Sequence, residues 1–453
     1  MFQSVSIIGI QRLFFQKVLF FHIPLFRYLF RTILNILLPY KIKTMKYYKL
    51  IITSIAFIGS TNIQSQVITR EDSLSAGLIA KNAPTVISGY GQAKVEYDLK
   101  NRTGVANLTR NVLFIGHRFS NKISFFSEME LEDAKIVGGK PSGEISMEQL
   151  FLKFNINRNN YIIGGLFIPR IGIINENHLP TTFNSNDRPF VEQLVIPSTW
   201  RELGISVYGQ IPKIPGLNYS AAIINGLSCA GFEQGSGLRE GRFEGSNASA
   251  SNLAVTGALL YYVKHFRIQA STYYGGSAGL SKKQGDSLHI DYGAFGTPVS
   301  LSEVNVQYNG TKGFHFKALG TYVSIKDADK INLAYANNTP SSMYGYYVEL
   351  GYNIFQAIDK LKTQSMLLFA RYESMDLNAS VPKNGIEDGL QQKQYIVAGL
   401  HYQPLKGVSV KLDYVYRVTG EYNKVLYVTN PYATNTPFYT NYQFINLGIG
   451  YSF

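Results

Sequence analysis

Hydrophobic and polar residues alternate along the C-terminal end of the chain. One face of an extended strand would carry Gln443, Ile445, Leu447, Ile449, Tyr451 and Phe453. The residues between them are small or polar, apart from Phe444. A period of two marks a strand whose two faces meet different surroundings. The apolar face would meet the core of a soluble protein or the lipid around a membrane barrel.

The same alternation recurs along most of the chain. From Thr85 onward, sixteen segments have strand character and are separated by turn-rich stretches. They are 85–99, 106–119, 122–133, 144–156, 160–167, 200–211, 216–225, 253–263, 265–275, 300–309, 313–324, 342–354, 363–374, 393–403, 407–420 and 441–453. An even number of antiparallel strands lets a barrel close with both chain ends on the same side.

The connections between these segments alternate between short and long. Turn residues such as Asn121-Lys122 and Pro404-Leu405-Lys406 close short ones, whereas 168–199 and 226–252 are long. Such alternation is typical of a transmembrane barrel with short periplasmic turns and long extracellular loops. The sequence therefore predicts an all-β fold over 85–453, a transmembrane antiparallel β-barrel of about 16 strands in the outer membrane of a Gram-negative bacterium.

The first 66 residues differ in kind, with eight Lys or Arg and no Asp or Glu. Residues 45–65 have a basic start, an apolar run and a small, polar end, which is the order of a secretory signal peptide. We interpret 1–44 as sequence upstream of the true start, with a membrane-anchoring segment as the alternative. Residues 66–84 would then be a short periplasmic segment before the barrel.

Composition and charge favour the barrel over other classes. Tyr, Phe and Gly are abundant, at 32, 28 and 41 residues, and aromatic residues suit the girdles at the two membrane interfaces. The net charge is +13, but without the eight leader cations 35 basic residues face 30 acidic ones. We expect no nucleic-acid partner, because no clustered basic helix or binding motif accompanies this small excess.

The sequence gives no sign of a cofactor or metal site. A single Cys, Cys229, excludes an intrachain disulfide and paired thiolate ligands. Acidic and Asn residues in the loops could bind Ca²⁺, but they lack the spacing of a known loop motif. We therefore expect neither cofactor nor metal.

A barrel of sixteen strands is too wide for side chains to fill, so water must occupy its interior. The inward strand faces carry charges of both signs. The residues expected on this wall are Lys94, Glu96, Arg267, Lys317, Arg371, Lys411 and Arg417, with Asp98, Glu128, Glu130, Glu132, Glu349, Glu373 and Asp413 as further acids. They either only solvate the wall or set a transverse field that orients polar solutes.

The longest connection, residues 168–199, is the expected constriction loop. Apolar residues such as Ile171 and Phe183 suggest that it is packed rather than disordered. If it folds into the lumen, Arg170 and Arg188 are the best candidates to meet anionic solutes. Their alternative role is an ion pair with Glu176, Asp187 or Glu192.

Several short motifs resemble one known family. They are Gly164-Gly165-Leu166-Phe167-Ile168-Pro169, Asp187-Arg188 in the long loop, Arg201-Glu202-Leu203-Gly204 and Ile224-Asn225-Gly226. Together they resemble the phosphate-selective porins O and P. The resemblance implies a sixteen-stranded, trimeric porin whose constriction loop presents basic residues to anions. It assigns this role to Arg188 and Arg201, with Arg170 as the basic residue after the proline.

The function expected is passive diffusion of small hydrophilic solutes, with anions such as phosphate among them. The expected partners are outer-membrane lipid, these solutes, a homotrimer of the chain and the barrel assembly machinery. A terminal aromatic residue resembles the insertion signal of outer-membrane barrels, so Phe453 is the residue that this machinery would recognise.

Three other functions are alternatives to a porin. An outer-membrane lipid or ester hydrolase needs a nucleophile and a base, but His117, His265, His315 and His401 come without a recognisable Ser or Cys motif. A structural or adhesive barrel could use residues 226–252. A plugged transporter would need more strands and a plug domain ahead of them.

Overall fold

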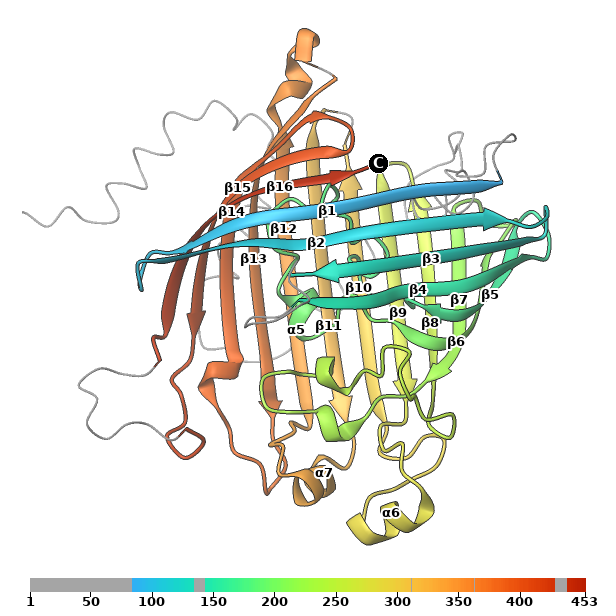
Figure 1. Ribbon diagram of the computed structural model, residues 1–453. Coiled ribbons are helices and arrows are strands. Elements are labelled where there is room, and N and C mark those ends of the chain that lie inside the picture. Colours follow the sequence, from blue (N-terminus) through green and yellow to red (C-terminus); the bar gives the residue numbers. More distant parts are fainter. Residues whose placement is uncertain (1–83, 134–142, 311, 362, 428–437) are drawn as a thin grey trace, which may run out of the picture. The chain divides into compact units, whose positions relative to one another are not determined.

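The computed structural model describes residues 84–133, 143–310, 312–361, 363–427 and 438–453. They form one antiparallel sheet that closes on itself (Figure 1). Each strand pairs with its sequence neighbours, and the first strand pairs with the last. The predicted sixteen-strand barrel is confirmed. The expected upstream segment 1–44, signal peptide 45–65 and most of the segment 66–84 lie outside the described residues.

The strands lie close to their predicted positions. Their bounds are β1 (Thr85–Asp98), β2 (Thr103–Arg118), β3 (Ile123–Glu132), β4 (Glu144–Asn155), β5 (Asn160–Phe167), β6 (Glu202–Gln210), β7 (Leu217–Asn225), β8 (Leu253–Val263), β9 (Phe266–Gly275), β10 (Val299–Asn309), β11 (Phe314–Ile325), β12 (Ser342–Asn353), β13 (Ser365–Ser380), β14 (Gln392–Leu405), β15 (Val408–Thr419) and β16 (Asn441–Ser452). The largest difference is β13, which continues to Ser380 through a shift in its register with β12.

The outward face of the strands is apolar, as a lipid-facing surface requires. On β16, Ile449 is 60% exposed, whereas its neighbours Gly448 and Gly450 face the interior and are buried. On β6, Ile205 is 63% exposed. A Lys or Arg on such a face would cost about 2–4 kcal/mol at the middle of the bilayer. The barrel therefore spans a membrane with its strands.

The connections at the two ends of the barrel differ in length. The end that holds Phe453 has tight turns such as 264–265 and 406–407. The other end has the long connections, with α6 (Lys282–Leu288) and α7 (Ala328–Tyr335) at its rim (Figure 1). In outer-membrane barrels short turns face the periplasm and long loops face outward, which places Phe453 at the periplasmic end.

The remaining helical elements are short. They are α5 (Val191–Leu194), η2 (Cys229–Gly231), η3 (Arg239–Gly241), η4 (Ile354–Ala357), η5 (Asp359–Leu361) and η6 (Gly389–Gln391). Within the described part of the chain, no helix combines the length and the hydropathy needed to cross a bilayer.

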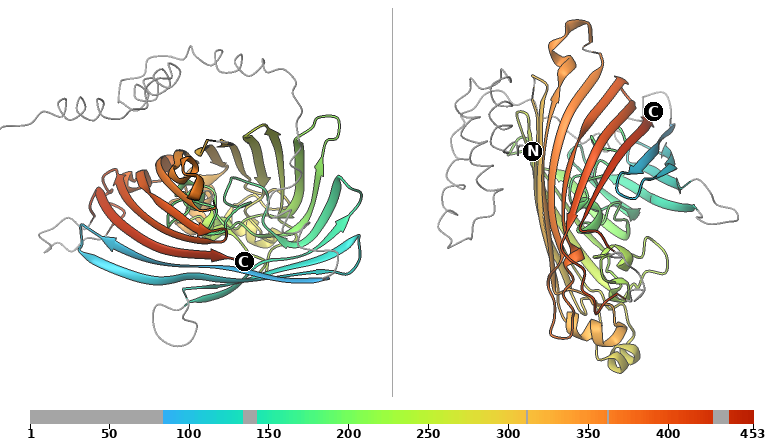
Figure 2. Two further views of the ribbon diagram at one scale, coloured as in Figure 1. Left: turned by 90° about the horizontal axis from the view of Figure 1, so that it is seen from above. Right: turned by 90° about the vertical axis from the view of Figure 1, so that its left-hand side faces the viewer.

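The constriction loop, residues 168–199, lies inside the ring of strands (Figure 2). Its residues Ile171, Val191 and Val195 are fully buried in one hydrophobic cluster. The same cluster contains wall residues of β9 to β14, including Tyr273 and Tyr347. The loop therefore packs against the inner wall of the barrel.

Candidate functional site

Hydrogen bonds hold the middle of the constriction loop to three strands. The Asn184 amide donates to Glu349 on β12 at 2.7 Å. The Arg371 guanidinium on β13 donates to the Ser185 hydroxyl at 2.7 Å. The Asn186 backbone N–H donates to the Asp413 carboxylate on β15 at 2.6 Å. These bonds fix the loop across the interior, so the passage has a defined width.

The loop also closes on itself around one buried carboxylate. Glu192, at 1% exposure, accepts hydrogen bonds from the backbone N–H groups of Ile173 and Ile174 at 2.6 and 2.7 Å. The hydroxyl of Tyr347 on β12 donates to its other oxygen at 2.7 Å. Glu192 therefore joins the two ends of the loop to the wall.

Most of the predicted wall charges meet a partner rather than open water. Lys94 pairs with Asp187 of the loop at 2.7 Å and with Glu96 at 3.3 Å. Arg267 pairs with Glu176 of the loop. These contacts neutralise charges that would otherwise be buried against the loop, which is costly without a counter-charge.

The inward charges on β11 to β15 are neutralised in the same way. Arg371 pairs with Glu349 at 2.9 Å and with Glu373 at 2.8 Å, and Lys317 lies 3.9 Å from Glu349. Lys411 donates to the Ser185 carbonyl at 2.9 Å. Nearer the long loops, the guanidinium of Arg417 lies 4.3 Å from the centre of the Tyr442 ring.

Two of the three predicted solute-binding arginines form ion pairs. Arg170 lies 2.9 Å from Glu176 and above the Tyr208 ring. Arg201 lies 2.6 Å from Glu244. For Arg170 the structure contains the ion pair with Glu176 that was the alternative to solute binding. The partner of Arg201 is Glu244, which lies in the long connection 226–252.

Arg188 differs from the other two arginines. It is 8% exposed, and its Nε and Nη2 atoms have no hydrogen-bond partner among the described residues. Its guanidinium also forms no ion pair with any described carboxylate. Burial and the nearby Arg110 guanidinium lower the pKa of Arg188 to about 10, so it keeps its charge at neutral pH. It is a buried cation with no carboxylate in direct contact, although the charges of Glu148 and Glu130 act on it at longer range.

Two cavities lie beside the constriction loop, along the inward faces of β1, β3 and β4. The outer cavity, of about 540 Å³, extends to the long connection 226–252. It is lined by five arginines and six acids: Arg110, Arg188, Arg201, Arg239, Arg242, Glu130, Glu132, Glu144, Asp187, Glu240 and Glu244. The inner cavity, of about 320 Å³, opens toward the short turns. Tyr90 and Glu128 line the inner cavity, whereas the next inward residues on their strands, Gln92 and Glu130, line the outer one.

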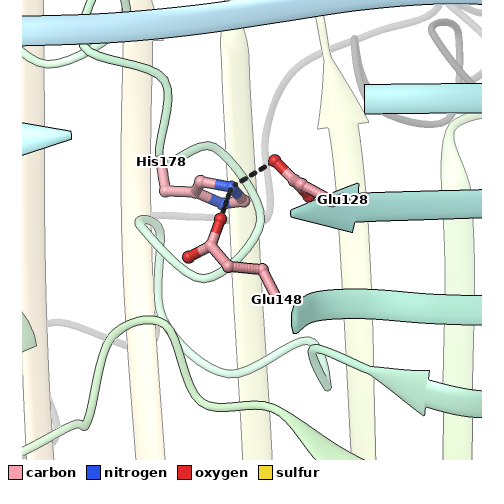
Figure 3. A group of neighbouring side chains, drawn as sticks. All are labelled: Glu128, Glu148 and His178. Atoms are coloured by element: carbon pink, nitrogen blue, oxygen red, sulfur yellow. Dashed lines mark hydrogen bonds and ion pairs between the residues drawn. The ribbon is translucent and has the colours of Figure 1, made fainter. Parts of the chain in front are cut away.

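Four residues lie between the two cavities and form what we call the septum: Tyr90, Glu128, Glu148 and His178. The His178 Nε2 atom lies 3.4 Å from Glu128 and 3.7 Å from Glu148 (Figure 3). The Tyr90 hydroxyl donates to Glu148 at 2.8 Å, and the Tyr90 and His178 rings meet edge to face. The septum therefore joins the loop to β1, β3 and β4.

Sequence reasoning did not identify Glu148 or His178 as functional. In a regular β4 strand, Glu148 would share the lipid-facing side with Leu150 and Leu152. The pairing of β3 with β4 instead skips Glu148, which leaves it in a β-bulge and turns it inward. The position of Glu148 in line with Leu150 and Leu152 was a signal that it turns inward, because a carboxylate in lipid is unfavourable.

Comparison with known proteins identifies relatives of the chain but does not identify its function. No family model matches it. The anion-selective porin of Comamonas acidovorans is 12% identical, with a TM-score of 0.49 over 82% of this chain and 99% of that one. The outer membrane channel DcaP of Acinetobacter baumannii is 13% identical, with a TM-score of 0.48 over 82% of this chain and 97% of that one. At these scores the likeness has no bearing on function.

A closer relative comes from the sequence. An uncharacterised protein of Aquifex aeolicus (strain VF5) is 31% identical over 342 residues, which are 73% of this chain and 74% of that protein. The chain belongs to the same family as this Aquifex aeolicus protein.

Proposed function

We propose that the chain is an outer-membrane porin through which small hydrophilic solutes diffuse passively. The carrying observation is the pair of cavities along β1, β3 and β4, which extend toward opposite ends of a closed barrel. Solutes would enter the outer cavity, pass the septum and leave through the inner cavity. The remaining width of the barrel is filled by the constriction loop, so this route is narrow.

We infer that the route prefers anions, phosphate-like ones among them. Arg188 supports this, because its buried Nε and Nη2 atoms have no hydrogen-bond acceptor and an anionic solute would supply one. The neighbouring Arg110 and Arg201 already face Glu130 and Glu244, at 3.2 and 2.6 Å. Arg188 is thus the cation best placed to bind a passing anion.

Planar-bilayer recording tests both parts of the proposal. Purified protein should form ion channels, and their reversal potential in a KCl gradient should indicate anion preference. Arg188→Gln should shift this potential toward cation preference, because it removes the charge but keeps a polar side chain. Arg102→Gln, in the exposed connection between β1 and β2, removes the same charge at a residue that lines neither cavity and should have no effect.

Three outcomes would count against the proposal. Absence of channels from correctly folded protein would exclude the porin function. An unchanged reversal potential in Arg188→Gln would remove Arg188 from the mechanism while leaving the pore intact. The proposal includes no catalytic activity, so ester or lipid hydrolysis that depends on one of the histidines would also contradict it.

The expected partners are part of the same proposal. A homotrimer is supported by the resemblance to porins O and P, and native mass spectrometry of detergent-extracted protein would determine the number of chains. Recognition by the assembly machinery is supported by the position of Phe453. Its backbone N–H donates to the Gly89 carbonyl at 2.9 Å, while its side chain is 73% exposed.

A further inference from the structure

We propose that Glu128, Glu148 and His178 bind one divalent transition-metal ion, with Zn²⁺ as the reference ion, at the septum. Their ligand atoms all lie within 4.8 Å of one another, and all three residues are buried. The residues come from β3, β4 and the constriction loop, so a bound ion would connect the loop to the wall (Figure 3). Imidazole nitrogen with carboxylate oxygen suits Zn²⁺ better than Mg²⁺ or Ca²⁺, which prefer oxygen alone.

The distances fit a shared ion better than direct hydrogen bonds. The His178 Nε2 atom is 3.4 Å from Glu128 Oε1 and 3.7 Å from Glu148 Oε2. A charge-assisted N–H···O bond is about 2.7–2.9 Å long. Two ligands on a tetrahedral Zn²⁺, each about 2.0–2.1 Å from the ion, are about 3.3 Å apart. Small movements would bring the three atoms to that spacing.

Neighbouring side chains orient both carboxylates, as the outer shell of a metal site does. Gln149 donates to Glu128 Oε2 at 2.6 Å, which leaves Oε1 toward His178. Thr199 donates to Glu148 Oε1 at 2.6 Å, and Tyr90 donates to Oε2 at 2.8 Å. Each carboxylate oxygen can accept more than one contact, so Glu148 Oε2 still has a lone pair for an ion.

The β-bulge is independent support for a site here. Glu148 has no partner in the β3–β4 ladder and is fully buried. Burying a carboxylate is unfavourable unless charge and hydrogen bonds compensate it. Bulges often re-aim a side chain at a functional position. The chain therefore departs from a regular strand at the position that completes a set of three metal ligands.

A bound ion would control the passage between the two cavities. Two ligands belong to the wall and one to the loop, and Glu128 also lines the inner cavity. Three protein ligands leave at least one coordination position for water. This second step, control of the passage, rests on the proposed porin function, whereas metal binding itself does not.

Metal binding is tested on the purified full-length protein after treatment with a chelator. After dialysis against Zn²⁺, elemental analysis should find about one ion per chain. Co²⁺ in its place should give the visible absorption of a low-coordinate site. The Zn²⁺ content should fall to background in His178→Ala and Glu128→Gln, whereas His315→Ala, in a histidine near a short turn, should keep it.

A conservative variant separates binding from folding. Tyr90→Phe removes only the hydroxyl that orients Glu148 and should weaken Zn²⁺ binding about 10–100-fold, the usual effect of losing an outer-shell partner. Heat-modified migration in gels checks that each barrel is folded. Wild-type protein that binds no Zn²⁺, or His178→Ala that binds as much as wild type, would overturn the proposal and leave a purely hydrogen-bonded cluster.

Bilayer recording tests the control of the passage. Micromolar Zn²⁺ should lower the conductance of wild-type channels reversibly, EDTA should restore it, and His178→Ala should not respond. If Zn²⁺ binds but leaves the conductance unchanged, the control step is wrong. Channels without Zn²⁺ binding refute the metal site alone, and Zn²⁺ binding without channels refutes the porin function alone.

Discussion

The amide of Asn186 lies 2.7 Å from the carboxylate of Asp413, although 227 residues separate them in the chain. The Asn186 backbone N–H donates to the same oxygen at 2.6 Å, and Asn446 donates to the other oxygen at 2.9 Å. Asp413 is 2% exposed, so these bonds compensate a buried carboxylate. The position of the constriction loop therefore depends on this contact.

Replacing Asn186 by Ala should loosen the loop. The change removes a hydrogen bond to a buried, charged acceptor, which should cost about 1–3 kcal/mol. In bilayer recordings, the single-channel conductance and its noise should rise. Asn121→Ala, in an exposed short turn, is the control and should leave both unchanged; an equal response in both variants would show that the loop position does not set the conductance.

A side chain at Gly448 should have the same effect. A Cβ atom added at Gly448 would lie 2.0 Å from the Asn186 amide oxygen, so the loop would have to move. Gly448→Ala should raise the conductance as Asn186→Ala does. At Gly320 an added Cβ meets nothing within 4 Å, and Gly320→Ala should conduct as wild type. Wild-type conductance in Gly448→Ala would mean that the loop accommodates the methyl group.

Removing the Arg371 charge should destabilise the barrel. Its guanidinium pairs with Glu349 and Glu373, at 2.9 and 2.8 Å, and all three residues are buried. Arg371→Met would leave Glu373 without its ion-pair partner and Glu349 with only Lys317, 3.9 Å away, at a cost of about 3–5 kcal/mol. Urea unfolding in lipid vesicles should show the loss. Lys282→Met, which breaks an exposed ion pair on α6, should unfold as wild type does.

The extracellular loops should open in acid through Asp388. Burial raises the pKa of this carboxyl, but hydrogen bonds from Tyr427, Gln391 and two backbone N–H groups outweigh burial and hold it below the ordinary value. Its stabilising contribution is therefore complete above the ordinary pKa of about 3.9 and is lost as the pH falls through the lowered value. Limited proteolysis should cut these loops faster in that range.

Asp388→Asn is the control for this pH effect. The amide has no charge to lose, so cleavage should be faster than in wild type at neutral pH and should not change on acidification. A cleavage rate in the variant that still rises at low pH would assign the effect to another group.

Deleting Phe453 should impair insertion but not conduction. The residue borders the inner cavity, but its ring is 73% exposed and it lies beyond the last strand. The amount of heat-modifiable protein in outer-membrane fractions should fall, whereas the channels that do assemble should have wild-type conductance. Adding one Phe after Tyr451-Ser452-Phe453 is a control for length alone.

The strands could be predicted because each is long, alternates with a period of two and ends in turn residues. The length of 168–199 and its apolar residues, which are also signals local to the chain, indicated the constriction loop. The pair of Arg170 with Glu176 was among the alternatives, because both residues lie in one loop. The partner of Arg201 could not be predicted, because Glu244 lies on a different long connection. Only the folded barrel brings these side chains together.

The β-bulge at Glu148 is the feature that the alternating pattern did not predict. A strict period of two assigns Glu148 to the lipid side, and one extra residue reverses that assignment. The septum was missed for this reason, since its second carboxylate seemed to face outward. His178 lay in a polar stretch of a long loop, where periodicity carries no information on side-chain direction.

The closure of the barrel between β1 and β16 has a consequence for assembly. Asn186 contacts both strands at this seam: Gln92 on β1 donates to its carbonyl at 2.6 Å, and its amide donates to the Asn446 carbonyl on β16 at 3.2 Å. The loop is thus bonded to both strands that complete the ring. We therefore expect the loop to align the first and last strands as they meet, acting as an internal template for the final step of folding.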